Sequence, residues 1–244
     1  MFYIWARKEN FMRISHILYA IIGLCFFKAS AYAGDSITES KNISVYTVLK
    51  VQGNFNVVIT QNGTCSLKIT ADKDLMSSID VKGQGVTLNI TMKADAKGTA
   101  TLYIGAKDLN QITITTTGNV SNTGVIKAAD LAVNIDGNAM VNFNLDAKVI
   151  NYTSSSNKES AIKGKADKVN LKDGGEGNID ASGLKTDNMN VEDSGDGDLI
   201  VYGHPELHVK ITGTGKLTYM GKPRVKTFKV EGAANSSQVV EGSK

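Results

Sequence analysis

The sequence predicts an all-β protein: a β-solenoid of two-strand repeats, each about 19 residues long, preceded by antiparallel β-hairpins. Two observations support this fold class. From Ile43 onward apolar and polar residues alternate, which is the period of a half-buried strand. From Leu109 onward a unit of fixed length recurs with Gly-x-Gly at a fixed position, a pattern typical of a solenoid.

The repeats are the clearest feature of the chain. Each copy consists of an alternating strand, a turn centred on Gly-x-Gly or its equivalent, and a second alternating strand. The first apolar residues of successive copies are Ile112, Leu131, Ile150, Val169, Met189 and Leu207, at spacings of 19, 19, 19, 20 and 18 residues. The predicted turn glycines are Gly118, Gly137, Gly175, Gly177, Gly195, Gly197, Gly213 and Gly215. Because such a short unit cannot bury a face alone, neighbouring copies must stack and align these positions into columns.

A column of glycines has two explanations, and the sequence alone leaves both open. Either the neighbouring backbone approaches too closely for a Cβ atom, or the residue has a positive φ. The earlier copies depart from the pattern, since Val120, Ala139 and Lys158 stand at the second glycine position and Ser156 stands at the first in one copy. We therefore expect the stack to be least regular between about residues 112 and 165.

The remaining segments complete the predicted domain organisation. Residues 43–105 indicate a meander of antiparallel hairpins, with turns at Asn62-Gly63 and at residues 82–85 and one helical turn at 72–78. The predicted parts are a signal peptide at 1–33, a loose polar arm at 34–42, the hairpins at 43–105, the solenoid at 106–232 and a disordered tail at 233–244. Residues 225–232 are expected to form a final half unit that caps the stack.

The N-terminal segment predicts secretion. Basic residues, including Arg13, precede an apolar run at 14–27, and a small-x-small motif ends at Ala33, so cleavage is expected between Ala33 and Gly34. The run is about 14 residues long and a spanning helix needs roughly 20, which favours a cleaved signal over a membrane anchor. No membrane span is expected in the remaining chain.

Two residues complicate this segment. Translation from Met12 instead of Met1 would give a signal peptide of more usual length. Cys25 suggests a lipid attachment site, but the bulky Leu24 before it is unlike the small residue of a lipoprotein signal.

After cleavage the chain is electrically neutral. The first 33 residues hold four of the 27 basic residues and one of the 24 acidic residues, which leaves 23 of each. A neutral chain with few, scattered aromatic residues offers neither the positive surface nor the stacking platform that nucleic acids require. We predict no nucleic-acid partner.

Cys65 is the one cysteine that remains after cleavage, so it cannot form an intramolecular disulfide. It occupies an apolar position in the alternating stretch at 65–69, which favours a small hydrophobic role over a nucleophilic one. Stability must then come from core burial and backbone pairing.

The acidic turn at 192–198 suggests a calcium loop, but its spacing argues against one. Asp193, Asp196 and Asp198 alternate with Gly195 and Gly197 in an order that fits neither the EF-hand loop nor the calcium-binding nonapeptide repeat. Aspartate and asparagine beside glycine are typical of tight turns. We predict no metal site and no cofactor.

No catalytic set emerges from the sequence. His204 and His208 fall in a turn and a strand, where they would be some 13 Å apart, so a shared metal ion is disfavoured. Arg224 is the single arginine after the signal, which argues against the positive cleft of a polysaccharide lyase.

The chain resembles the bacterial "head GIN domain" family of auto-transporter adhesins. The matching features are the alternating pattern from Leu49 to Ile59, the three later Gly-x-Gly turns, and the ending Tyr219-Met220-Gly221-Lys222-Pro223. The resemblance covers roughly residues 43–232. It implies a β-superhelix distantly similar to polysaccharide lyases, a role in cell-surface adhesion, and no catalytic residues.

The leading hypothesis is an exported, non-enzymatic solenoid that presents a surface to a host or cell-surface protein or glycan, either in the periplasm or outside the cell. One alternative is a polysaccharide-active enzyme with an acidic site near residues 173–198, and another is a structural periplasmic scaffold. The open ends of a solenoid expose unpaired strands, which favours self-association.

Overall fold

The computed structural model describes residues 36–203, 205–232 and 239–242, all within one compact unit, Asp35–Lys244. The predicted signal peptide, its cleavage site at Ala33 and Gly34, and His204 lie outside the described residues. The described chain is all-β apart from one short helix. It contains no helix that is long and apolar enough to cross a membrane.

The strands follow one another closely along the sequence. They are β1 Ser36–Lys41, β2 Val48–Gln52, β3 Phe55–Gln61, β4 Ser66–Asp72, β5 Ile79–Gln84, β6 Thr87–Met92, β7 Ala100–Ala106, β8 Gln111–Thr116, β9 Asn119–Thr123, β10 Ile126–Gly137, β11 Met140–Ser154, β12 Ser160–Asp173, β13 Ile179–Asp193, β14 Leu199–Tyr202, β15 Glu206–Ile211, β16 Leu217–Met220, β17 Val225–Val230 and β18 Val239–Glu241. Helix α1, Lys73–Met76, lies between β4 and β5.

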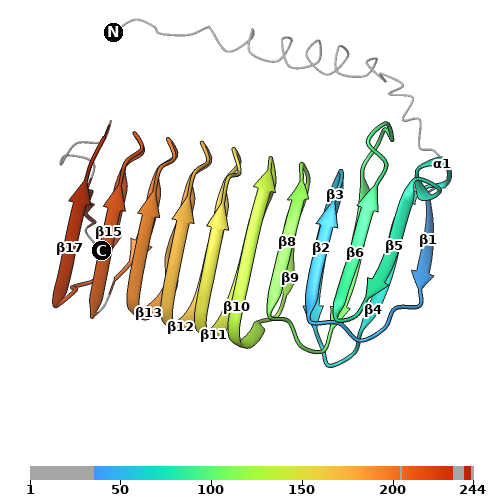
Figure 1. Ribbon diagram of the computed structural model, residues 1–244, viewed down its shortest axis with the longest axis horizontal. Helices are drawn as coiled ribbons and strands as arrows, with labels where there is room; N and C mark the ends of the chain where they lie inside the picture. Colours follow the sequence, from blue (N-terminus) through green and yellow to red (C-terminus); the bar gives the residue numbers. More distant parts are fainter. Residues whose placement is uncertain (1–35, 204, 233–238, 243–244) are drawn as a thin grey trace, which may run out of the picture. The chain divides into compact units, whose positions relative to one another are not determined.

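Most of these strands wind into a solenoid of about six turns, and the antiparallel strands β1, β4 and β5 extend its N-terminal end as a curled mixed sheet (Figure 1). The structure has two faces, which we call sheet I and sheet II. Sheet I consists of β5, β6, β2, β8, the C-terminal parts of β10–β13, β15 and β17, in that order. Sheet II consists of β1, β4, β7, β3, β9, the N-terminal parts of β11–β13, β14, β16 and β18. Strands β11–β13 are long because each bends from sheet II into sheet I. We call one circuit of the chain a rung.

The predicted phase of the repeat is confirmed from the second copy onward. The register partners are Leu131 with Ile150, Ile150 with Val169, Val169 with Met189, and Met189 with Leu207. The extra residue of the 20-residue copy is absorbed in sheet II, where the pairing of β12 with β13 shifts between Ala161 and Lys163.

The first predicted spacing is wrong. Ile112 pairs with Val133, two residues beyond the predicted Leu131. The additional residues lie in the corner at 122–125 between β9 and β10. There the Asn122 side chain takes the place of backbone pairing: its Oδ1 accepts the Asn144 N–H at 2.8 Å, and its Nδ2 donates to the Asn144 carbonyl at 3.1 Å. The polar residues of this corner do not follow the alternating pattern of the strands. The two additional residues were therefore not predictable from the sequence.

The N-terminal part differs from the predicted meander. β5 and β6 do form the antiparallel hairpin expected around residues 82–85. Asn62 and Gly63 close no hairpin, because β7 lies between β3 and β4, parallel to the first and antiparallel to the second. β2 and β3 are instead parallel rungs of the solenoid, paired with β8 and β9. Alternation identifies strands but does not identify their partners.

The two ends of the solenoid also hold more strand than the sequence predicts. Residues 36–41 of the predicted loose arm form β1, which pairs antiparallel with β4. Within the predicted disordered tail, β18 pairs with β16. Backbone pairing to an exposed sheet edge explains both, since it needs no apolar side chains. The predicted helical turn at 72–78 contains α1, which buries Leu75 and Met76, and the predicted half unit contains β17.

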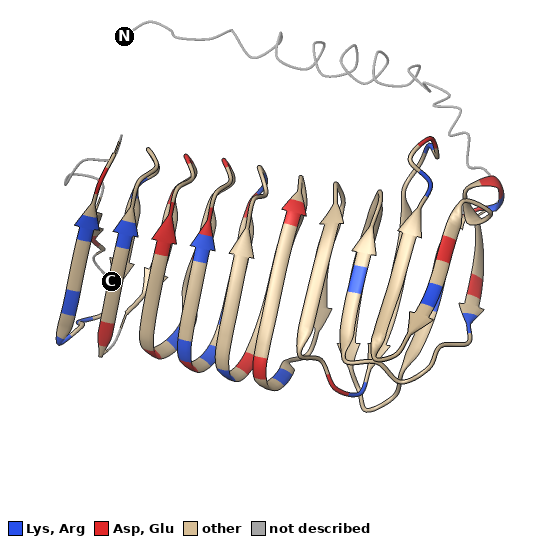
Figure 2. Cartoon of the chain, in the orientation of Figure 1, with Lys and Arg blue, Asp and Glu red and all other residues tan. Residues whose placement is uncertain are grey.

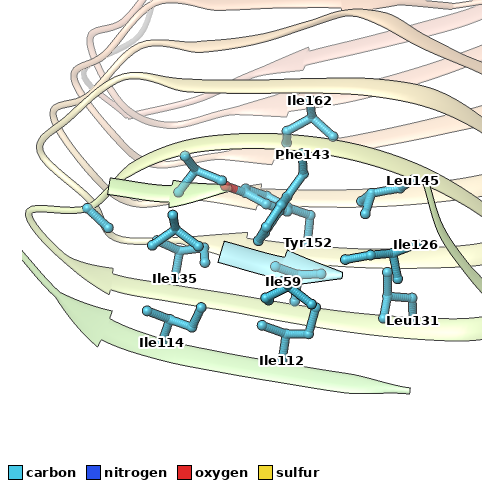
Figure 3. Packing of buried hydrophobic residues seen from close by; sticks show 14 of the residues in the cluster. Ile59, Ile112, Ile114, Ile126, Leu131, Ile135, Phe143, Leu145, Tyr152 and Ile162 are labelled. Carbon is cyan, nitrogen blue, oxygen red and sulfur yellow. The ribbon is translucent and has the colours of Figure 1, made fainter. Parts of the chain in front are cut away.

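One apolar core runs between the two sheets. Its inward side chains stack in columns, of which Val133, Tyr152, Leu171, Val191 and Val209 form one, all buried. Figure 3 shows Phe143 and Tyr152 among the aliphatic side chains that fill the interior. Burying one such side chain contributes roughly 1.5–3 kcal/mol, so a stack of these columns stabilises the fold without cross-links.

Candidate binding surface

The glycines of the three C-terminal turns form two inward-facing columns where the chain passes from sheet I to sheet II. Gly175, Gly195 and Gly213 make up the first column, and the residues two positions later make up the second. None of these six glycines has a positive φ, and of the eight predicted turn glycines only Gly137 does, at 83°.

Close backbone approach explains these columns. A Cβ atom at Gly195 would lie 2.7 Å from Asp173 Oδ2 and closer still to the carbonyl oxygen of Gly175. Gly213 faces the carbonyl of Gly195 in the same way. Of the two explanations that the sequence left open, the first therefore holds for the six glycines and the second does not.

The turn between β11 and β12 has serine where the later turns have glycine. Ser156 lies directly before Gly175 in the first column, and its Oγ donates to the carbonyl of Ala139 at 2.8 Å. The same Oγ accepts the N–H of Lys158 at 3.1 Å. In this turn a serine hydroxyl donates a hydrogen bond to the carbonyl of the preceding rung, at the position where the later turns have glycine.

The first turn departs further from the predicted column. Gly118 faces the carbonyl of Phe55, and Gly137 faces that of Thr116, so the two glycines are not aligned with each other as predicted. Thr116 Oγ1 bonds both backbone groups of Phe55, accepting from its N–H and donating to its carbonyl, each at 2.9 Å. The slip at residues 122–125 causes this difference in phase.

Four turns share one further hydrogen bond. A side-chain oxygen accepts the backbone N–H of the residue two positions later, the geometry of an Asx or Ser/Thr turn. The acceptors are Thr116, Ser154, Asp173 and Asp193, and the donors are Gly118, Ser156, Gly175 and Gly195, at 2.9–3.3 Å. These side chains hold the turns in shape.

The three acids of the turn at 193–198 do not converge on one point. Asp193 is buried, whereas Asp196 and Asp198 are exposed. Asp196 accepts the hydroxyl of Thr214 at 2.6 Å, and Asp198 accepts the N–H of Lys216 at 2.9 Å. Within the described residues no group of three or more His, Cys, Asp or Glu side chains could hold a metal ion.

Asp173 and Asp193 point into the protein instead of into solvent. They are register partners on β12 and β13, and their exposed fractions are 3% and 2%. Burial raises the pKa of each carboxyl from its ordinary value of 3.8 to about 6, against the opposing effect of the backbone N–H that each accepts. The charge of Asp193 raises the pKa of Asp173 further.

His208 and Cys65 lie far apart in the fold and serve no common site. His208 is on β15 at the outer surface of sheet I, with its Nε2 3.9 Å from a carboxylate oxygen of Glu206. Cys65 directly precedes β4, is partly buried and packs against the core, in agreement with an apolar role.

The outer surface of sheet I carries in-register columns of amide and hydroxyl side chains. In one column Asn170 Nδ2 donates to Asn151 Oδ1 at 2.8 Å, and Asn190 Nδ2 donates to Asn170 Oδ1 at 3.1 Å. The next column contains Thr113, Asn134 and Thr153 on β8, β10 and β11. Parallel strands place such side chains about 4.8 Å apart along each column.

We call the outward residues of β6, β8, β10 and β11 the amide–hydroxyl face. They are Thr87, Asn89, Thr91, Gln111, Thr113, Thr115, Ala132, Asn134, Asn151 and Thr153, with the charged Asp136 at the end of β10. β2 lies between β6 and β8 in sheet I and presents Lys50 and Gln52 on the same surface. This face was not predicted from the sequence. A usable signal was present, since the same strand offset carries an uncharged polar residue in successive copies.

Charge separates this face from the C-terminal part of the same sheet. The column that contains Thr153 continues with Lys172, Glu192, Lys210 and Lys229. Figure 2 shows these charges on β12, β13, β15 and β17, whereas β8 and the middle of β11 carry none. The middle of sheet I is therefore mainly uncharged and polar, with Lys50 on β2 and Asp136 at the end of β10 as its charges, whereas charged residues dominate the C-terminal end.

The C-terminal edge of sheet I carries a lysine in an interior column. Lys226 pairs with Leu207, so it continues the column of Leu131, Ile150 and Met189. Its Nζ lies 3.2 Å from the hydroxyl of Tyr219 and 5.4 Å from the centre of that ring. An inward-pointing charge on an edge strand opposes edge-to-edge pairing.

The sequence matches a protein-family model described as "Putative auto-transporter adhesin, head GIN domain" over residues 45–223. The chain belongs to this family. The matched range begins three residues before β2 and ends two residues before β17, so the head GIN domain comprises the solenoid itself. No curated protein matches the sequence.

Solved structures share the head GIN fold. A putative adhesin from Bacteroides fragilis superposes with a TM-score of 0.76 at 20% identity, covering 84% of this chain and 96% of the other. A putative adhesin from Parabacteroides merdae gives 0.66 at 19% identity, with 86% and 98% covered. A protein from Parabacteroides distasonis described as a putative lipid binding protein gives 0.62 at 18% identity, with the same coverage.

Proposed function

We propose that this head GIN domain is an exported, non-enzymatic binding module that contacts a protein or glycan at the cell surface or within the envelope. The observation that carries the proposal is the amide–hydroxyl face, on which uncharged donors and acceptors repeat in register over the neighbouring strands β8, β10 and β11. A flat array of this kind suits an extended partner whose own polar groups repeat. The description of the family and of two structural neighbours as adhesins supports the same role.

Burial argues against the enzymatic alternative at the acidic turns. Asp173 and Asp193, the first acids of their turns, are 3% and 2% exposed and cannot contact a polymer in solution. The exposed Asp196 and Asp198 are engaged in hydrogen bonds that hold neighbouring rungs together. We infer a structural role for all four.

Export is part of the proposal and rests on the signal-like segment that ends at Ala33. Binding at a surface and a purely structural role in the periplasm differ in what they predict for isolated cells. A binding module transfers to cells or matrix when added from outside, and a scaffold does not.

The test adds charge to the amide–hydroxyl face. Asn134 and Thr153 are register partners on its surface, and no side-chain hydrogen bond ties either to a described neighbour. In the double variant Asn134→Lys/Thr153→Lys, binding of the labelled protein to cells and to immobilised glycans should fall at least about tenfold, since two desolvated charges oppose an uncharged polar contact.

The matched control is Ser121→Lys/Asn142→Lys on sheet II, which makes the same change in charge at a pair of register partners on the opposite face. Binding should persist in this variant, and both variants should melt as the wild type does. Equal binding by the two variants and the wild type would show that sheet I is not the binding surface.

A further inference from the structure

One interior column contains polar and acidic side chains in its middle and isoleucine at both ends. Its members in register are Ile135, Ser154, Asp173, Asp193 and Ile211, contributed by β10, β11, β12, β13 and β15. All five are buried. Two carboxyl side chains therefore occupy positions that the preceding rung fills with serine and the following rung fills with isoleucine.

Each carboxyl accepts a backbone N–H through Oδ1, and hydrogen bonding from Ser154, the neighbour of Asp173 in the column, also opposes the rise in the pKa of Asp173. Asp173 Oδ1 and Asp193 Oδ1 accept the N–H of Gly175 and Gly195 at 3.3 and 2.9 Å. Their Oδ2 atoms are buried and accept no hydrogen bond from any described residue. A buried acceptor without a partner costs about 1–3 kcal/mol, and more when it is charged.

The two side chains also oppose each other. They stand on neighbouring parallel strands, which are about 4.8 Å apart, and both point to the same interior. Two carboxylates at such a distance are not readily ionised together. A single proton removes one charge and creates an O–H donor beside the oxygen that lacks a partner.

We propose that Asp173 and Asp193 form a buried proton-binding site that tightens the C-terminal rungs when a proton is bound and loosens them when it leaves. The ligand is the proton itself. One proton shared by the two carboxyls supplies the hydrogen-bond donor that the Oδ2 atoms lack and removes one of the two negative charges. The site lies at the turns, where each glycine of the columns packs closely against a backbone carbonyl of the preceding rung.

Few other titratable groups face this pair. Tyr152 on β11 interacts with Asp173, and burial raises its pKa so far that it remains neutral. Asp196 in the following turn adds a negative charge near Asp193. The neighbours of the pair within the column are the hydroxyl of Ser154 on one side and Ile211 on the other. Lys172, Glu192 and Lys210 are exposed on the outer surface of sheet I. No described cation neutralises the pair from within the core.

The direction of the pH effect follows from the raised pKa values of about 6. Because the folded state holds the proton more tightly than the unfolded state, the stabilisation is complete below the ordinary pKa of 3.8 and is lost as pH rises through about 6. The solenoid is thus tightened by acid and loosened at neutral and alkaline pH.

The test compares melting temperatures of the purified protein between pH 4 and pH 8 with those of Asp173→Asn/Asp193→Asn. The variant replaces both carboxyls by neutral groups of the same size. The melting temperature of the variant minus that of the wild type should rise by about 5 °C or more from pH 4 to pH 8. A second variant, Asp173→Ser/Asp193→Ile, copies the residues of adjacent rungs and should behave alike if the amide variant folds poorly.

The control Asp167→Asn/Asp187→Asn removes two exposed carboxyls from the same two strands. Its melting temperature should follow that of the wild type at every pH. The proposal is overturned if the difference between the interior variants and the wild type does not depend on pH. It is equally overturned if 2 mM calcium at pH 8 raises the wild-type melting temperature but not that of the variants, because the ligand would then be a metal ion.

Discussion

In both the C-terminal turns and the earlier turns, the inward residue must pack against a backbone carbonyl of the preceding rung. The two groups of turns do this in two different ways. At Gly195 the inward position lies against the carbonyl of the preceding rung, and only a residue without a Cβ fits there. At Ser156 the same position carries a hydroxyl that donates to the preceding carbonyl of Ala139. The solenoid therefore needs close contact or a donor at the turn, and it does not need glycine as such.

The largest effect is expected where a side chain meets backbone on a glycine turn. In Gly195→Val the new Cβ would overlap the carbonyl of Gly175 and crowd Asp173 Oδ2, and neither can withdraw without shifting a rung. We expect the free energy of unfolding to fall by more than about 3 kcal/mol, measured by urea denaturation.

The control is a glycine-to-valine substitution at Gly174, which directly precedes Gly175 in the preceding turn. Gly174 is exposed, and a Cβ there would meet only the Ser194 hydroxyl at 3.5 Å, an ordinary contact. Gly174→Val should change stability by less than about 0.5 kcal/mol, as surface substitutions do. Equal losses in both variants would contradict the close-contact explanation.

A smaller effect is expected at the turn between β8 and β9, which Thr116 holds through its hydroxyl. Thr116→Val keeps the shape of the side chain but removes the oxygen that accepts the N–H groups of Phe55 and Gly118 and donates to the Phe55 carbonyl. The expected loss is about 2 kcal/mol, because buried backbone groups are left unpaired. Thr116→Ser keeps the oxygen and should recover most of this loss in the same denaturation experiment.

The smallest effect tests whether the two kinds of turn are interchangeable. Ser156→Gly gives the turn between β11 and β12 the same residue type as the next turn has at Gly175. It removes the two hydrogen bonds that the Ser156 hydroxyl forms with Ala139 and Lys158. We expect a loss of about 1 kcal/mol or less. A loss as large as that of Thr116→Val would show that the turn between β11 and β12 depends on the Ser156 hydroxyl and cannot adopt the geometry of the glycine turns.

The fold could be predicted from the sequence wherever copies stack in register. The alternation and the recurring glycines gave the repeat from Leu131 onward and the family resemblance, and the family is confirmed. The partners of β2, β3 and β4 were not predictable, because a pattern of period two is the same for a hairpin strand and for a rung. The pairing of β1 and β18 depends on backbone groups that composition does not reveal.

The buried carboxyls were identified as turn residues but not as interior ones. The information was present, since Asp173 is two residues after Leu171 and four after Val169, and so falls on the inward parity of its strand. Typical turn chemistry concealed it, because aspartate beside glycine is expected to face solvent. The amide–hydroxyl face was overlooked for the converse reason, since uncharged polar residues on the outer side of a strand attract no attention singly.

The corner at residues 122–125 has a consequence for how such a chain can vary. Two additional residues are housed there while the rungs on either side keep their hydrogen-bonded register, because Asn122 bridges to Asn144 across the break. Insertions at corners leave the interior columns untouched and change only what projects from one edge. A solenoid of this kind can acquire or lose peripheral loops, and with them new surface chemistry, without its core being redesigned.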